Sequence, residues 1–120
     1  MVYTTAVLDM SNAMAWGKLR WKGSRDEDAQ IIIRTRTGND TDPNLYWLPS
    51  NIPGEFRQLD RQQFERANIE TRFTTLDRDN WSFWSSPYAW EDGLADTTLA
   101  AADWLDGTPI LSPGPSRYIQ

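Results

Sequence analysis

Hydrophobic and polar residues alternate with a period of two along several stretches of this chain, which is typical of β-strands. The clearest stretch is 29–37, AQIIIRTRT, because β-branched residues occupy most of it. Alternation places Arg34 and Arg36 together on one face of this strand, opposite Ile33 and Thr35. Shorter stretches of the same kind predict further strands at 3–10, 18–22, 71–76 and 117–120.

The densest aromatic run is WSFWSSPY, residues 81–88. If this run is a strand, Trp81 and Phe83 lie on one face and Trp84 on the other, so that both faces carry a large ring. An Arg guanidinium is well suited to cover a Trp ring. We therefore expect Arg34 or Arg36 to lie within cation–π distance of Trp81 or Trp84, as a structural cluster of Trp and Arg side chains.

Two helices are expected in insertions between the strands. Asp60 is placed as an N-cap with Gln63 as its reciprocal partner, which predicts a short helix over 61–68. A second short helix is expected to begin at Asp96.

The composition favours a β-rich core. The chain has 120 residues, enough for a single domain over 1–120, and its 7 Trp residues make much of its apolar volume aromatic. The fold class expected from these features is all-β and mainly antiparallel, with one or two short helices.

The absence of Cys and His excludes thiol nucleophiles, disulfides, imidazole acid–base chemistry and the usual zinc sites. A pair of carboxylates would be the remaining route to acid–base catalysis. The acidic residues between 91 and 106 lie in no apolar context that would raise the pKa of one of them. We therefore expect no catalytic residues, and a protein that is not an enzyme.

The formal net charge of −5, from 12 basic and 17 acidic residues, argues against nucleic acid as a partner. No apolar run is long enough to span a membrane, and the first residues lack the pattern of a signal peptide.

Two further features suggest ligands. The spacing Asp40-x-Asp42-x-Asn44 is similar to part of a calcium-binding loop, although the Gly and distal Glu of such loops are missing, and a loop closed by Asx turns is the alternative. A structural calcium ion is thus the one cofactor considered. An exposed Trp could also stack on a sugar ring, and the candidates are Trp47, Trp90 and Trp104, for each of which a place in the core is the alternative.

Five blocks, in this order along the chain, carry a resemblance to a known class of module: Leu8-Asp9-Met10, Gly17-Lys18-Leu19-Arg20-Trp21, Arg34-Thr35-Arg36-Thr37-Gly38-Asn39, the run 81–88, and the closing Ser112-Pro113-Gly114-Pro115-Ser116-Arg117-Tyr118-Ile119-Gln120. Together they resemble a discoidin-like (galactose-binding-like) β-sandwich module of large exported bacterial proteins. The resemblance implies a jelly-roll β-sandwich, an extracellular or cell-surface location, and neighbouring domains. It transfers no ligand-binding residue. Separately, Trp81-Ser82-x-Trp84-Ser85 is similar to the short motif of cytokine-receptor fibronectin modules in which Trp and Arg side chains interleave.

The chain departs from the module that it resembles at its end. The last strand of such modules continues beyond the Arg-Tyr-Ile-Gln point, so this chain is expected to be a fragment of a longer one with a clipped last strand. A shortened closing strand would leave an open sheet edge, and open edges pair with other chains. The expected function is a non-catalytic structural or protein-interaction module that self-associates through such an edge, and the alternative is a carbohydrate-binding module that uses loop Trp residues.

Overall fold

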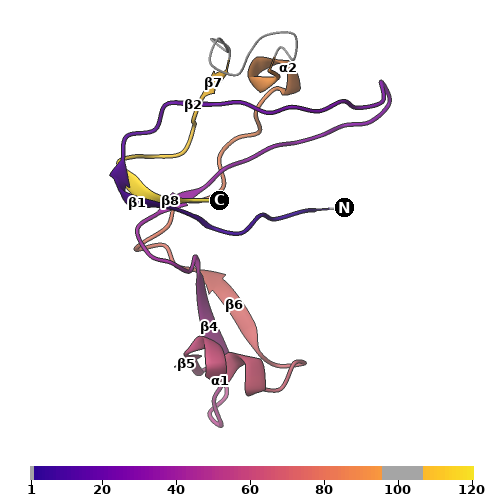
Figure 1. The fold of residues 1–120 in the computed structure, drawn as a ribbon. Coiled ribbons are helices and arrows are strands. Elements are labelled where there is room, and N and C mark those ends of the chain that lie inside the picture. The colour runs from indigo at the N-terminus through magenta and orange to yellow at the C-terminus, as the bar shows by residue number, and fades with distance from the viewer. Residues whose placement is uncertain (1, 96–106) are drawn as a thin grey trace.

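The computed structural model describes residues 2–95 and 107–120, and it shows an elongated molecule with two lobes (Figure 1). The Cα radius of gyration is 18.3 Å and the principal extents are 60 × 37 × 22 Å. A compact domain of 120 residues would have a radius of gyration of about 14 Å. The chain is therefore far more open than one tightly packed core would allow.

The first lobe contains a three-stranded antiparallel sheet in the order β1-β8-β3. Its strands are β1 (Leu8–Met14), β8 (Ser116–Ile119) and β3 (Thr37–Gly38). A second, two-stranded sheet pairs β2 (Lys18–Leu19) with β7 (Thr108–Pro109). The closing strand β8 thus lies in the centre of its sheet, flanked on both sides. An open sheet edge is therefore not found at β8 itself, because β1 and β3, both from the N-terminal third of the chain, pair with it on either side.

The second lobe is an antiparallel sheet in the order β5-β4-β6, with one helix packed beside it. Its elements are β4 (Asn44–Pro49), β5 (Phe56–Leu59), α1 (Arg61–Arg66) and β6 (Phe73–Leu76). The rings of Tyr46 and Phe64 lie 4.8 Å apart and join β4 to α1. β5 was not predicted from the sequence, because the stretch that leads into it contains Pro and Gly.

Helix α1 begins where the sequence predicts. The Asp60 side chain accepts from Gln63 N at 2.7 Å, and Asp60 N donates to Gln63 Oε1 at 3.0 Å, which completes the capping box. The helix ends at Arg66, two residues earlier than expected, because Ala67 is already extended. The second predicted helix, from Asp96, lies outside the described residues; a separate short helix, α2 (Trp90–Gly93), precedes it.

Some predicted strands are displaced or shortened. Of the stretch 29–37, only Thr37 belongs to a sheet strand, β3, and Ile33 forms an isolated bridge with Tyr88. β1 begins at Leu8 rather than near Tyr3, and it contains an irregularity where Ser11 has φ 71° and its N–H donates to Asp9 Oδ1. Alternation alone identifies extended backbone, but it does not tell which residues find a strand partner.

Mostly antiparallel strands in small sheets and two short helices place the described chain in the all-β class that the sequence predicts. Among the helices of the described ranges, none is long and apolar enough to cross a membrane.

Candidate functional site

The aromatic run 81–88 lies along the extended segment 33–38. Three backbone hydrogen bonds join them, from the amides of Ser82, Ser85 and Tyr88 to the carbonyls of Thr37, Thr35 and Ile33, at 2.8, 2.7 and 3.0 Å. From one hydrogen bond to the next, the run therefore advances by three residues while the facing segment advances by two. The prediction that the run alternates as a strand is wrong, because its spacing of hydrogen bonds repeats every three residues.

Ser82 and Ser85 supply further bonds at this three-residue spacing. The Ser82 hydroxyl oxygen accepts from Thr37 N and the Ser85 hydroxyl oxygen accepts from Thr35 N, both at 3.0 Å. Each serine therefore satisfies an N–H and a C=O of the facing residue, one with its side chain and one with its backbone. A period of three also brings Trp81 and Trp84 to the same side of the run.

Arg36 covers both of these rings. Its guanidinium carbon lies 4.3 Å from the Trp84 ring centroid and 5.7 Å from that of Trp81. Its Nε and Nη2 donate to Gln120 Oε1 at 2.9 and 2.7 Å. Burial lowers the pKa of Arg36, and the nearby Asp42 carboxylate raises it. The expected cation–π contact is present, and Arg36 forms it.

Trp81 anchors this cluster in the protein. Only 4% of its surface is exposed, and its Nε1 donates to the Asp40 carbonyl at 3.0 Å. Its ring lies so close to Gly38 that a Cβ atom there would overlap it. Trp84 is 41% exposed, so the outer ring of the stack remains at the surface.

A cluster of buried hydroxyls lies behind the same segment. Thr35 Oγ1 is 2.8 Å from the Tyr88 hydroxyl and 2.7 Å from Ser112 Oγ, and the Tyr88 oxygen accepts from Leu111 N at 2.9 Å. Among the described residues, every buried polar side-chain atom has a hydrogen-bond partner. These hydroxyls therefore form a satisfied structural network that ties the C-terminal segment to the aromatic run.

The proposed calcium residues lie in one turn-rich loop. Asp40 Oδ1 accepts from Asp42 N at 3.3 Å, and Asp42 Oδ1 accepts from Asn44 N at 2.9 Å. The hydroxyl of Tyr46 donates to Asp42 Oδ2, and burial followed by this hydrogen bond raises the pKa of Tyr46. The loop thus has the geometry of successive Asx turns. Over 2–95 and 107–120, no three acidic side chains gather in a way that could hold a metal ion.

The candidate sugar-binding Trp residues are far from equivalent. Trp47 lies on β4, is partly exposed, and its Nε1 donates to Thr75 Oγ1 at 2.8 Å. Trp90 belongs to α2, where its carbonyl accepts from Trp21 Nε1 at 3.1 Å and its ring lies 6.0 Å from that of Trp21. Trp104 lies outside the described residues.

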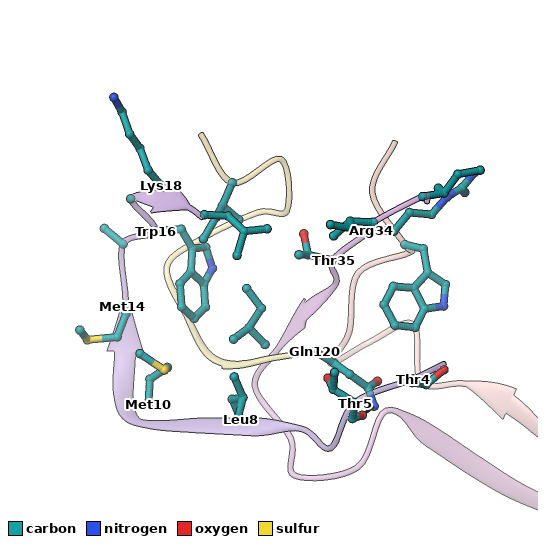
Figure 2. A pocket seen from close by; sticks show the side chains of 18 of the residues that line it. Thr4, Thr5, Leu8, Met10, Met14, Trp16, Lys18, Arg34, Thr35 and Gln120 are labelled. Atoms are coloured by element: carbon teal, nitrogen blue, oxygen red, sulfur yellow. Dashed lines mark hydrogen bonds between the residues drawn. The ribbon is translucent and has the colours of Figure 1, made fainter. Parts of the chain in front are cut away.

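An open apolar cavity of about 650 Å³ lies between the sheets of the first lobe (Figure 2). Leu8, Met10 and Met14 line it from β1, and Trp16 and Ile110 line it from the other layer. Several of these side chains are exposed, with Leu8 at 58% and both methionines at 41%. This surface is not predicted by the sequence as a binding site, although the alternation around Leu8 and Ile33 indicates an apolar face.

Comparison with protein-family models, with curated proteins and with solved structures finds no match to this chain.

Proposed function

We propose that this chain is a non-catalytic structural or protein-interaction module. The observation that carries the proposal is the distribution of its apolar side chains. Of the described residues, thirteen large hydrophobic side chains are exposed, whereas the buried hydrophobic residues are Leu59, Trp81, Tyr88, Ala95 and Tyr118. Six of the thirteen line the same cavity of the first lobe, and a contiguous exposed apolar surface of this kind is typical of a protein that binds another macromolecule.

The exposed surface includes an open strand edge. β1 is the outermost strand of its sheet, and every residue of it is exposed. Met10 and Met14, both on this strand, are side chains that adapt readily to a partner surface. Self-association through the β1 edge is the form of interaction that we propose first, in place of an edge at β8.

The proposal extends to the setting of the module. The resemblance of the sequence to discoidin-like modules supports a jelly-roll β-sandwich that is exported by a bacterium and flanked by other domains. The paired layers β1-β8-β3 and β2-β7, with apolar side chains between them, are compatible with part of such a sandwich.

The test is the mass of the protein by light scattering over a wide concentration range. Self-association predicts a mass that rises with concentration and a shift back to monomer in Met10→Lys, since a lysine on an edge strand discourages pairing. Ile69→Lys is the matched control, because Ile69 is an exposed apolar residue that lies outside the sheets. A monomer at all concentrations would refute self-association.

The second candidate is a carbohydrate-binding module, and the hydrogen bond that fixes the partly exposed Trp47 ring favours it. A rigid ring at the surface is a suitable platform for a sugar. A glycan array with the wild type and Trp47→Ala tests this idea. Binding that the substitution abolishes would favour the carbohydrate module over the protein-interaction module.

A further inference from the structure

The sheet of the second lobe has two unlike faces. Its registers set Trp47 opposite Gln58 of β5 and opposite Phe73 of β6, so these three side chains share one face. Tyr46, one position earlier on β4, points to the other face, where its ring packs on that of Phe64 in α1. Helix α1 therefore covers the face of Tyr46 and leaves the face of Trp47 at the surface.

Three aromatic rings are fixed on this uncovered face. Trp47 Nε1 donates to Thr75 Oγ1 at 2.8 Å, and this bond between β4 and β6 holds the indole in one orientation. Phe56 and Phe73 belong to the two outer strands, whose backbones lie about 9.6 Å apart. Their ring centroids are only 5.3 Å apart, so both rings lean over β4 toward each other. Phe56 is 56% exposed, and the other two rings are partly exposed. The uncovered face, which we call the aromatic face, is formed by Trp47 and Pro49 of β4, Phe56 and Gln58 of β5, and Phe73 and Thr75 of β6.

The aromatic face is uncharged, although 24% of the residues in the chain are charged. β4 and β6 contain no charged residue, and the one charged residue of β5 is Arg57. Because Arg57 lies between Phe56 and Gln58 in the sequence, alternation turns it to the side of α1. A charged ligand would lose water on this face without gaining an ion pair. The face is therefore suited to a neutral ligand.

Two arginines border the aromatic face beyond Thr75. Arg36 and Arg78 line a cavity together with Thr75. The Arg36 guanidinium carbon lies 4.3 Å from the Trp84 ring centroid, and that of Arg78 lies 5.0 Å from the Phe83 ring centroid. Both cations thus pack on rings of the run 81–88, and they are the reason to compare an acidic ligand with a neutral one.

The size of the aromatic face favours a slender ligand over a folded protein. Three strands span about 14 Å across the sheet, and the six residues of β4 span about 20 Å along it, which gives roughly 300 Å². Each partner in a stable protein complex buries about 800 Å². Sugar rings pack their C–H faces on aromatic rings, and polar groups beside those rings bond to the sugar hydroxyls. Such groups are present, since the Gln58 amide is exposed and the Thr75 hydroxyl, which accepts from Trp47, can still donate its own proton.

From these features we infer that the aromatic face binds a neutral, unbranched glycan, with its sugar rings packed on Trp47 and on the pair of Phe56 and Phe73. The inference rests on the second candidate function, a carbohydrate-binding module, and names its site and its ligand class. The bond to Thr75 draws the indole toward the start of β4, whereas Phe56 pairs with the last residue of β4, Pro49. The two aromatic positions thus follow each other along β4, so the ligand is a chain rather than a single sugar. β-1,4-linked glucose fits this surface, because its equatorial hydroxyls leave both faces of each ring apolar.

The test measures the binding of cellohexaose, a β-1,4-linked glucose hexamer, to the whole chain by isothermal titration calorimetry. We expect saturable binding that is about tenfold weaker for cellobiose, which reaches only one aromatic position. The β-1,4-linked glucuronic acid hexamer is also expected to bind about tenfold more weakly, because its carboxylates meet no cation on the face.

Variants on the two faces of β5 locate the site. Phe56→Ala is expected to weaken the binding of cellohexaose about fivefold, while Phe56→Tyr, which keeps the ring, retains it. The matched control is Arg57→Ala, on the same strand but the other face, which leaves binding unchanged. Thermal unfolding checks that each variant is folded.

Each other outcome overturns the inference. Binding of cellohexaose that persists in both Phe56→Ala and Trp47→Ala moves the glycan site elsewhere, and binding of other glycans but not of cellohexaose rejects the ligand class; in both cases the carbohydrate-binding module stands. Tighter binding of the glucuronic acid hexamer assigns the ligand to the border with Arg36 and Arg78. No binding to any glycan refutes the inference and the second candidate function together. Loss of self-association in Phe56→Ala, without glycan binding by the wild type, assigns the aromatic face to an interface between copies of the chain.

Discussion

The stack of Arg36 on two Trp rings leads to a quantitative prediction for Arg36→Met, which keeps most of the aliphatic stem and removes the guanidinium. The contact with Trp84 at 4.3 Å is well placed, while that with Trp81 at 5.7 Å is near the limit, so the two together contribute about 1.5 kcal/mol. The two hydrogen bonds to Gln120 share one acceptor atom and add about 1 kcal/mol. Relief of the guanidinium desolvation, which lowers the Arg36 pKa, offsets part of this sum.

The expected loss is therefore about 2 kcal/mol of the free energy of unfolding. Urea denaturation followed by Trp fluorescence measures it as a decrease of about 1 M in the midpoint. Arg36→Lys is expected to lose about half as much, because the ammonium keeps the charge but not the planar, two-donor geometry. Arg57→Met, at an exposed position of β5, is the control and should change the midpoint little.

A double-mutant cycle with Trp84→Ala isolates the stack itself. If the ring and the guanidinium interact as described, the two substitutions together cost less than the sum of the single ones, by about 1 kcal/mol. Strictly additive losses, or an Arg36→Met variant as stable as Arg57→Met, would show that the stack contributes nothing to stability.

Four further predictions follow from single contacts. Tyr88→Phe should lower the free energy of unfolding by about 1–3 kcal/mol, because it removes both the acceptor of the Leu111 N–H and the buried hydroxyl contact with Thr35; a loss under about 0.5 kcal/mol would contradict this. Gly38→Ala should be strongly destabilising in thermal unfolding because the new Cβ meets the Trp81 ring, while Gly17→Ala, with open space around its Cβ, should leave the Tm nearly unchanged. The Arg117 guanidinium lowers the pKa of Asp9 below its usual 3.8, so the pair stabilises the fold above that pH and loses its effect as the pH falls through the lowered value; Asp9→Asn should remove this acid dependence in a pH titration of the Tm. Calcium at Asp40, Asp42 and Asn44 would raise the Tm in a chelator-sensitive way, and an identical Tm with and without chelator would refute it.

The sequence predicts local structure well where the residues that stabilise it lie within about one helical turn of each other. The capping box at Asp60 and Gln63 is such a case, because both partners are three residues apart and need no other contact. The all-β class and the pairing of Arg36 with Trp rings are also readable, since β-branched and aromatic composition and the affinity of guanidinium for Trp are properties of the residues themselves.

Only the tertiary structure decides which extended segments become partners. The stretch 29–37 is the best strand by composition, but it pairs with the run 81–88 without a regular ladder. The hydrogen bonds recur every three residues of the run, and the hydroxyls of Ser82 and Ser85 accept two of them. β8 is central rather than at an edge because residues near both Leu8 and Thr37 reach it across more than eighty positions of sequence. The apolar cavity of the first lobe forms for the same reason, since Leu8 and Ile33, which both line it, come from segments that no local pattern brings together.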